Sequence, residues 1–346
     1  MPINAPVEYY KAEEKFKSAK NREEKIRALE EMIRYLPKHK GTENLLRDLR
    51  RRLAKLRAER ETKPAPKPRF VIKKEGAGQV CLIGLTNSGK STLLKKLTGV
   101  EVEIADHPYT TQEPKIGMME YKDVQIQIVE IPSTFTKELM SIVRGCDGIV
   151  FVIDGEKDLF KQKEELLKIM EENRIKINEE PKDIKVERRP VGGIEIRGVK
   201  YLKGDVEEVK QILIASGYNN CVLVLNQPCT IDDIMDALDK SLVYKNAIFV
   251  VTKNEYLDVE ELKEEIWKML GLIRVYTKAP NKDKPEEKPV TLPVGSTVKD
   301  LVERLHKDFL KHFKFAKVVG KSVKHGKGRV GLDHVLEDGD IVEIHT

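Results

Sequence analysis

Residues 84–91 read Gly-Leu-Thr-Asn-Ser-Gly-Lys-Ser and match the phosphate-binding pattern GxxxxGK[ST] at every fixed position. An apolar stretch that predicts a strand precedes them, and the helix-forming segment TLLKKLTG follows. In this context the glycines let successive backbone N–H groups turn inward around phosphates at a helix N-terminus. The alternative is a plain strand-to-helix turn that matches the pattern and both flanks by chance. The sequence therefore predicts a nucleotide site, which we assign to Asn87, Ser88, Gly89, Lys90, Ser91 and Thr92.

Two side chains of this loop carry the predicted chemistry. Lys90 is expected to pair with the β- and γ-phosphates of a nucleoside triphosphate and to act as the main catalytic group. The Ser91 hydroxyl is expected to bind Mg²⁺.

Size and composition limit the possible classes of protein. The chain has 346 residues, enough for two or three domains, and its formal charge of +6 gives only a weak preference for polyanionic partners. No apolar run approaches the ~20 residues that cross a bilayer, and the N-terminus does not resemble a signal peptide. The cysteines show no metal-ligand or CxxC spacing, so we expect buried thiols and a cytoplasmic protein. They are Cys81, Cys146, Cys221 and Cys229.

Composition and periodicity change twice along the chain. Residues 7–60 predict amphipathic helices, and the proline-rich stretch at 61–69 predicts a linker. Strands then alternate with helices, which is typical of a mostly parallel sheet in an α/β domain. We expect six strands in this sheet, at residues 79–84, 114–121, 124–131, 148–154, 221–226 and 247–252.

More than sixty residues separate the fourth and fifth of these strands, which is far more than a plain crossover needs. We expect an inserted α+β subdomain there. From about residue 273 the order strand, strand, helix and short strands predicts a β-grasp module.

The phosphate loop, the segment PYTTQEP at 108–114 and the order of elements resemble the Obg-related GTPases, most closely those of the developmentally regulated GTP-binding (DRG) type. The segment 313–344 resembles the end of a TGS domain. The resemblance implies a P-loop G domain that binds GTP or GDP with Mg²⁺. The boundaries that follow are 1–60 (helical domain), 61–77 (linker), 78–155 (G domain, first part), 156–217 (inserted α+β subdomain), 218–272 (G domain, second part) and 273–346 (TGS-like β-grasp domain).

The resemblance also assigns roles to single residues. The switch threonine falls at Thr111, with Thr110 beside it, and is expected to close over the γ-phosphate and complete the Mg²⁺ shell. Without the phosphate loop upstream, a surface turn would be the preferred interpretation of these threonines; with it, the functional role is preferred. Asn87 takes the place at which related K⁺-stimulated GTPases carry an asparagine, so a K⁺ role is possible.

The family's DxPG motif appears as Glu130-Ile131-Pro132-Ser133. Glu130 has one methylene more than aspartate and is still expected to reach the metal. Ser133 replaces a glycine whose freedom at positive φ the serine lacks. We therefore expect a stiff γ-phosphate sensor and slow turnover.

The family's guanine-reading NKxD motif has two candidate positions. We assign it to the segment 226–229, Asn-Gln-Pro-Cys, in which Asn226 and Gln227 lie near the base and Cys229 replaces the guanine-binding carboxylate. The alternative is the segment 252–255, Thr-Lys-Asn-Glu. We disfavour it because the sheet needs six strands, and in the preferred register Thr252 and Lys253 take the place of the family's SA loop beside the base.

Basic residues predict partners at both ends of the chain. They can neutralise RNA phosphates, or they can form a solvated face paired with acidic neighbours. The resemblance favours ribosomal or transfer RNA or translation factors, with no membrane. The residues are Lys38, His39, Lys40, Arg47, Arg50, Arg51, Arg52, Lys55, Arg57 and Arg60 in the helical region, and Lys314, Lys317, Lys321, Lys324, His325, Lys327 and Arg329 near the C-terminus.

The sequence thus predicts a slow Mg²⁺-dependent GTPase switch that acts on the ribosome, RNA or translation factors. Two alternatives are a non-hydrolysing RNA-binding scaffold, favoured by the altered motifs, and an NTPase with relaxed base choice.

Overall fold

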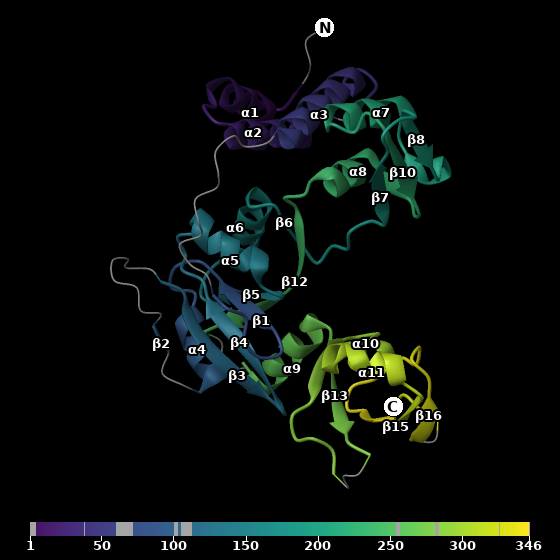
Figure 1. The fold of residues 1–346 in the computed structure, drawn as a ribbon. Coiled ribbons are helices and arrows are strands. Elements are labelled where there is room, and N and C mark those ends of the chain that lie inside the picture. Colours follow the sequence, from purple (N-terminus) through teal and green to yellow (C-terminus); the bar gives the residue numbers. More distant parts are fainter. Residues whose placement is uncertain are drawn as a thin grey trace. The chain divides into compact units, whose positions relative to one another are not determined.

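The computed structural model describes residues 5–37, 39–59, 72–99, 103–104, 113–253, 257–280, 284–324 and 326–345. The chain divides into two compact units, one formed by residues 1–67 and 179–244 and the other by residues 68–178 and 245–346 (Figure 1). None of the described helices is long and apolar enough to cross a membrane.

The first unit combines the N-terminal helices with the inserted region. Apolar side chains of α3 (Glu43–Ala58) and α7 (Val206–Ala215) share one core, in which Leu53 and Leu213 are almost fully buried. The predicted apolar stripes of the N-terminal helices are confirmed, because their leucines lie in this core or pack against it. The remaining helices of the unit are α1 (Val7–Ser18), α2 (Arg22–Tyr35), η1 (Val199–Tyr201) and α8 (Ile231–Leu238).

A three-stranded sheet of the first unit has the order β7-β10-β8. Its strands are β7 (Ile184–Arg188), β8 (Ile194–Arg197) and β10 (Cys221–Leu225), with β10 antiparallel to β7 and parallel to β8. The short strands β9 (Leu202–Lys203) and β11 (Cys229–Thr230) pair separately.

The second unit contains a seven-stranded sheet with the order β2-β3-β4-β1-β5-β12-β6. The central strand β1 is parallel to β4 and to β5, and all five of its residues are buried. The strands are β1 (Gln79–Ile83), β2 (Glu103–Ile104), β3 (Lys115–Tyr121), β4 (Val124–Glu130), β5 (Gly148–Asp154), β6 (Ile175–Ile177) and β12 (Val243–Thr252).

Helices cover both faces of this sheet, as the α/β prediction requires (Figure 1). Leu94 of α4 and Ile266 of α9 join one core with Leu82 of β1. Figure 1 shows α5 and α6 on the opposite face. The helices are α4 (Lys90–Thr98), α5 (Lys137–Gly145), α6 (Leu159–Glu172) and α9 (Val259–Leu270).

The prediction that residues 221–226 form the fifth strand of the main sheet is wrong. Residues 221–225 form β10 and bond to strands of the first unit, while β12 pairs directly with β5 in parallel. β6, which precedes the inserted region, lies beside β12 in the strand order. Residues 218–244, predicted to belong to the second part of the G domain, lie in the first compact unit, and the second unit resumes at residue 245.

The C-terminal module has a five-stranded sheet with the order β14-β13-β17-β15-β16. Its core contains Val275, Leu301 and Val342, and the β-grasp prediction is confirmed. The single helix predicted in this module is interrupted at His306, which has extended backbone. The elements are β13 (Leu272–Lys278), β14 (Val290–Pro293), α10 (Val298–Leu305), α11 (Lys307–His312), β15 (Phe315–Val319), β16 (Lys327–Val330) and β17 (Ile341–His345). All four cysteines of the chain are free and buried, as predicted.

Candidate functional site

The phosphate loop joins β1 to α4 in the geometry that its glycines require. Gly89 caps α4 with φ 85°, a left-handed conformation that favours glycine. A Cβ at Gly84 would lie 2.4 Å from the Val152 carbonyl oxygen and 2.5 Å from Ser88 Oγ, so only glycine fits there. No side chain caps the first turn of α4, which leaves its N–H groups available to an anion.

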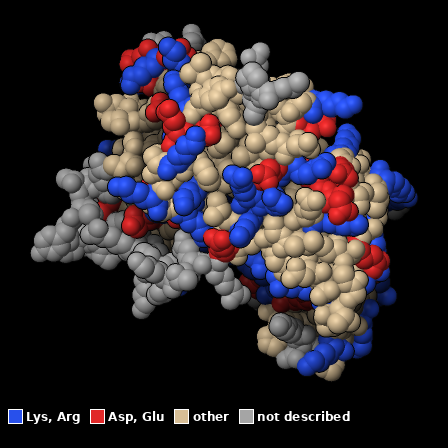
Figure 2. All heavy atoms as spheres, turned by 90° about the horizontal axis from the view of Figure 1, so that it is seen from above, with Lys and Arg blue, Asp and Glu red and all other residues tan. Residues whose placement is uncertain are grey.

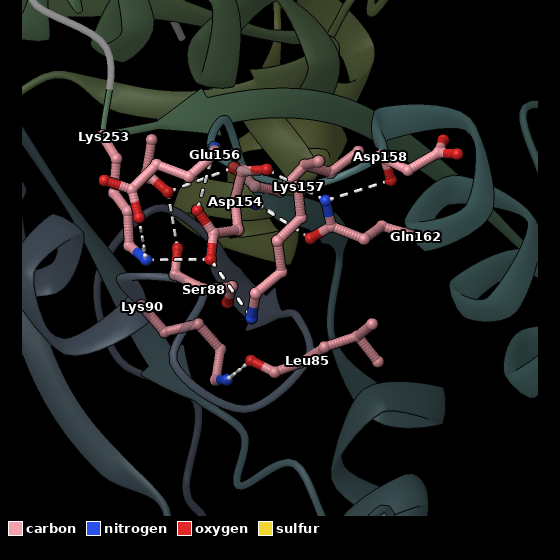
Figure 3. A network of polar contacts seen from close by, with 11 residues as sticks. Leu85, Ser88, Lys90, Asp154, Glu156, Lys157, Asp158, Gln162 and Lys253 are labelled. Carbon is pink, nitrogen blue, oxygen red and sulfur yellow. Dashed lines mark hydrogen bonds and ion pairs between the residues drawn. The ribbon is translucent and has the colours of Figure 1, made fainter.

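Lys90 is buried against the loop that it was predicted to serve. Its Nζ donates to the carbonyl oxygens of Gly84 (2.8 Å) and Leu85 (3.0 Å; Figure 3) and to Ser133 Oγ (2.7 Å). Burial lowers the pKa of the Lys90 ammonium, although Glu130 opposes this shift. The loop thus holds a cation at the place where the sequence predicts phosphate binding.

Ser133 contributes its side chain as well as its backbone. Its hydroxyl donates to the Gly84 carbonyl oxygen (3.0 Å) and accepts from Lys90. A glycine at this position would form neither bond. The segment after β4 is therefore tied to the phosphate loop, in agreement with the expected stiffness of the sensor.

Ser91 and Glu130, which the sequence predicts as metal ligands, lie in contact with each other and beside an additional cation. The Ser91 hydroxyl donates to Glu130 Oε1 (2.7 Å), and Glu130 Oε2 is buried with no hydrogen-bond partner among the described residues. Lys115 Nζ lies 3.2 Å from Ser91 Oγ and 3.8 Å from Glu130 Oε2. Hydroxyl and carboxylate oxygens are ligands that Mg²⁺ prefers, and Glu130 has an oxygen to spare, so this donor set fits the metal.

The end of β12 contacts the phosphate loop. The Thr252 hydroxyl lies 2.5 Å from the Ser88 carbonyl oxygen and 3.1 Å from that of Ile153. A Cβ at Gly89 would meet Thr252 Oγ1 at 3.1 Å, so the threonine packs against this glycine. The last residue of β12 therefore borders the nucleotide loop directly.

Lys253 is fixed beside Thr252 by two carboxylates. Its Nζ donates to Asp154 Oδ2 (2.8 Å) and Glu156 Oε2 (3.1 Å), and Lys157 approaches the same Asp154 oxygen at 3.3 Å (Figure 3). Asp154 is 1% exposed, and the Lys253 ammonium lowers the pKa of its carboxyl. Lys253 has φ 57°, so the chain turns sharply as it leaves the strand.

The site that the sequence predicted is thus only partly brought together. Asn226 and Gln227 lie in the first unit, where Asn226 Nδ2 donates to Asp183 Oδ2 (2.8 Å), and β12 occupies the sheet position assigned to their strand. The strand assignment on which their place beside the base rested was wrong, since β10 pairs with β7 and β8 and not with the main sheet. Cys229 is buried in the core of the first unit.

Other predicted residues lie in the loop or cannot be placed. Asn87 lies in the loop at φ 62°, and Thr92 is exposed on α4. The threonines at 110 and 111 lie outside the described residues, as do residues 254 and 255 of the Thr-Lys-Asn-Glu segment.

The sequence analysis missed Lys115, Asp154 and the side-chain role of Ser133. Lys115 is directly opposite Glu130 in the β3–β4 ladder. Tyr121 pairs with Val124 across a two-residue turn, so counting back along both strands from this turn would have found the pair. Asp154 ends β5 next to β1 in the sheet, a position at which a polar residue is a functional signal.

Part of the basic face of α3 is paired with acidic side chains. Arg50 bonds Glu208 (3.0 Å) and Asp232 (2.9 Å), and Arg47 and Arg57 also pair with acidic side chains of the inserted region. Figure 2 shows a face of the molecule on which acidic side chains lie among the basic ones. These three arginines follow the alternative of a face paired with acidic neighbours.

Comparison with protein families gives three matches that together span most of the chain. Residues 79–186 match the model described as 50S ribosome-binding GTPase. Residues 191–265 match the model described as the C-terminal region of the MMR_HSR1 domain, and residues 273–346 match the TGS domain.

Relatives of similar length exist in archaea and eukaryotes. An uncharacterized GTP-binding protein of Methanocaldococcus jannaschii is 31% identical, over 93% of this chain and 92% of the relative. Developmentally-regulated GTP-binding protein 1 of Xenopus laevis is 31% identical, over 92% of this chain and 98% of the relative. Ribosome-interacting GTPase 1 of Saccharomyces cerevisiae is 31% identical, over 93% and 98%.

Proposed function

The chain belongs to the family of developmentally regulated GTP-binding proteins, and on this premise we propose that it binds GTP and GDP at the loop between β1 and α4. The observation that carries the proposal is the arrangement of Lys90, buried against the glycine-framed loop with its ammonium held by backbone carbonyls. An incoming phosphate would replace these carbonyls as the partner of the ammonium.

Ser91 and Glu130 are the residues that would hold Mg²⁺, and Thr111 is a further predicted ligand. The bound metal would neutralise phosphate charge. The chain's own contribution is to orient the phosphates, through Lys90 and the free N–H groups of α4.

We assign base recognition to the segment that follows β12. Thr252 borders the loop, and the sequence continues with Lys253, Asn254 and Glu255. Glu255 then takes the place of the family's guanine-binding aspartate and keeps a carboxylate that accepts two hydrogen bonds. The proposal is therefore guanine preference, in contrast to the loss of preference expected from Cys229. Coordination of K⁺ by Asn87 stays a prediction.

Hydrolysis is proposed to be slow because Ser133 ties the segment after β4 to Gly84. Reorganisation of this segment around a γ-phosphate must first break the bond. Replacing Ser133 by glycine removes it, and one hydrogen bond of about 1 kcal/mol corresponds to a roughly fivefold faster turnover. Phosphate release under single-turnover conditions tests this, with Ser141→Gly on α5 as the control.

The proposed partner is the ribosome in the cytoplasm. One relative is named a ribosome-interacting GTPase, and a matched family model is described as ribosome-binding. Because three arginines of α3 are paired, the C-terminal lysines such as Lys321, Lys324 and Lys327 are the better candidates for RNA contact.

Calorimetric titration with GDP, GTP and ATP in the presence of Mg²⁺ tests the proposed function. We expect GDP and GTP to bind and ATP to bind at least about a hundredfold more weakly. Equal affinities for ATP and GTP would contradict the guanine assignment. Absence of all binding would contradict the proposal and favour a scaffold. Sedimentation with ribosomes at increasing salt would then test the partner.

A further inference from the structure

Lys115 presents a positive charge between the two side chains that are predicted to hold the metal. Its strand places it directly opposite Glu130. Its Nζ lies 3.2 Å from Ser91 Oγ and 3.8 Å from Glu130 Oε2, while the Glu130 side chain is only 11% exposed.

The hydrogen bonds of Ser91 and Glu130 leave oxygen lone pairs free to interact with a cation. The Ser91 hydroxyl donates its hydrogen bond to Glu130 Oε1, so the lone pairs of Ser91 Oγ can accept from the Lys115 ammonium. Glu130 Oε2 accepts no hydrogen bond from a described residue and faces the same ammonium. The oxygens that suit a divalent ion are thus already turned toward a fixed monovalent charge.

The charge also lies close to where the nucleotide is proposed to bind. Ser91 follows Lys90 in the first turn of α4, whose unpaired N–H groups are the proposed phosphate partners. A lysine ammonium is a compact point charge on a flexible stem, and it can reach phosphate oxygens from this position. At a distance of about 4 Å, the attraction between a lysine ammonium and a phosphate oxygen contributes substantially to the binding free energy, even when solvent partly screens it.

We propose that Lys115 is a built-in cation of the nucleotide site, and that it supports binding of a guanosine diphosphate when no Mg²⁺ is present. The inference rests on the proposed function and adds a residue to it. Affinity for the nucleotide then depends only weakly on Mg²⁺, because the metal and the ammonium serve the same oxygens and phosphates.

The test compares GDP affinity of the full chain in millimolar Mg²⁺ and in excess EDTA, by calorimetry. We expect wild type to lose less than about threefold on removal of the metal, and Lys115→Met to lose about tenfold or more. Lys115→Arg keeps the charge and should behave like wild type. Lys96→Met, at an exposed position of α4, is the matched control and should also behave like wild type.

A thermal unfolding midpoint for each variant separates loss of folding from loss of affinity. Equal losses for wild type and a folded Lys115→Met would overturn the inference while leaving the proposed function intact. If Lys115→Met does not fold, the wild type decides alone, and a tenfold or greater loss in EDTA overturns the inference. Failure of wild type to bind GDP even with Mg²⁺ would overturn the proposed function and the inference together.

Discussion

The ends of β10 and β12 have similar sequences but lie in different structural surroundings. β10 runs into Asn-Gln-Pro-Cys and β12 into Thr-Lys-Asn-Glu, and both follow apolar strands. After β10, Asn226 bonds Asp183 within the first unit, whereas at the end of β12 the Thr252 hydroxyl bonds the phosphate loop. What makes such a segment part of the proposed nucleotide site is the neighbour of its strand in the sheet, since of these two strands only β12 pairs with β5.

The largest contrast between the two strand ends is expected in nucleotide affinity. Lys90→Ala removes the buried ammonium of the loop, and we expect GDP affinity to fall by about a hundredfold or more. Asn226→Ala leaves the second unit unchanged and should alter affinity by less than about twofold. Calorimetry with both variants checks this, and a comparable loss in Asn226→Ala would return β10 to the site.

In the first unit we expect the opposite pattern, in which a substitution lowers stability and leaves nucleotide affinity unchanged. Arg50→Met leaves the largely buried Glu208 with only the more distant Arg47, at 3.8 Å, and the free energy of unfolding should fall by about 1–3 kcal/mol. Its GDP affinity should stay at the wild-type value. Arg51→Met, which breaks only an exposed pair with Asp48, is the control and should cost at most about 1 kcal/mol. Chemical denaturation measures both, and equal losses would mean that Arg50 is no more important than a surface arginine.

A smaller effect sharpens the role of β12. Thr252→Val keeps the shape of the side chain but removes the hydroxyl that satisfies Ser88, and we expect GDP affinity to fall by roughly fivefold, or about 1 kcal/mol. Thr230→Val removes the capping hydroxyl of α8 in the first unit and should lower stability without changing affinity. Unchanged affinity in Thr252→Val would show that the contact does not support the loop.

The smallest expected effect lies in the C-terminal module, which contains neither strand end. Lys317, His345 and Lys278 surround Glu343 and lower the pKa of its carboxyl to about 2. Because this folded value lies below the ordinary 4.5, the stabilisation is fully present above about pH 4.5 and is lost as pH falls toward 2. Glu343→Gln should therefore flatten the acid side of the stability profile, as measured by unfolding midpoints. A profile as steep as that of wild type would contradict the assignment.

Local and non-local parts of the fold were predictable to different degrees. The phosphate loop followed from eight consecutive residues, because its glycines and Lys90 act within one turn of the chain. The partner of β10 did not follow, since apolar strands such as CVLVL and AIFVV both suit a buried sheet. Which of them enters the main sheet depends on contacts across more than sixty residues of insertion.

Side-chain partners within the site divide in the same way. The Lys115–Glu130 pair was within reach of sequence reasoning, since a two-residue turn fixes the register of its hairpin. The contact of Thr252 with Ser88 joins residues 164 positions apart and required the sheet order. The bond from Ser133 to Gly84 likewise depends on β4 lying next to β1.

Hydrogen–deuterium exchange of the full chain, with and without GDP and Mg²⁺, tests the central claim most directly. The account predicts slower exchange on binding in the loop at 84–92 and at the end of β12 up to Lys253, with no change at residues 221–229. Slower exchange at residues 221–229 while the end of β12 stays unchanged would contradict it.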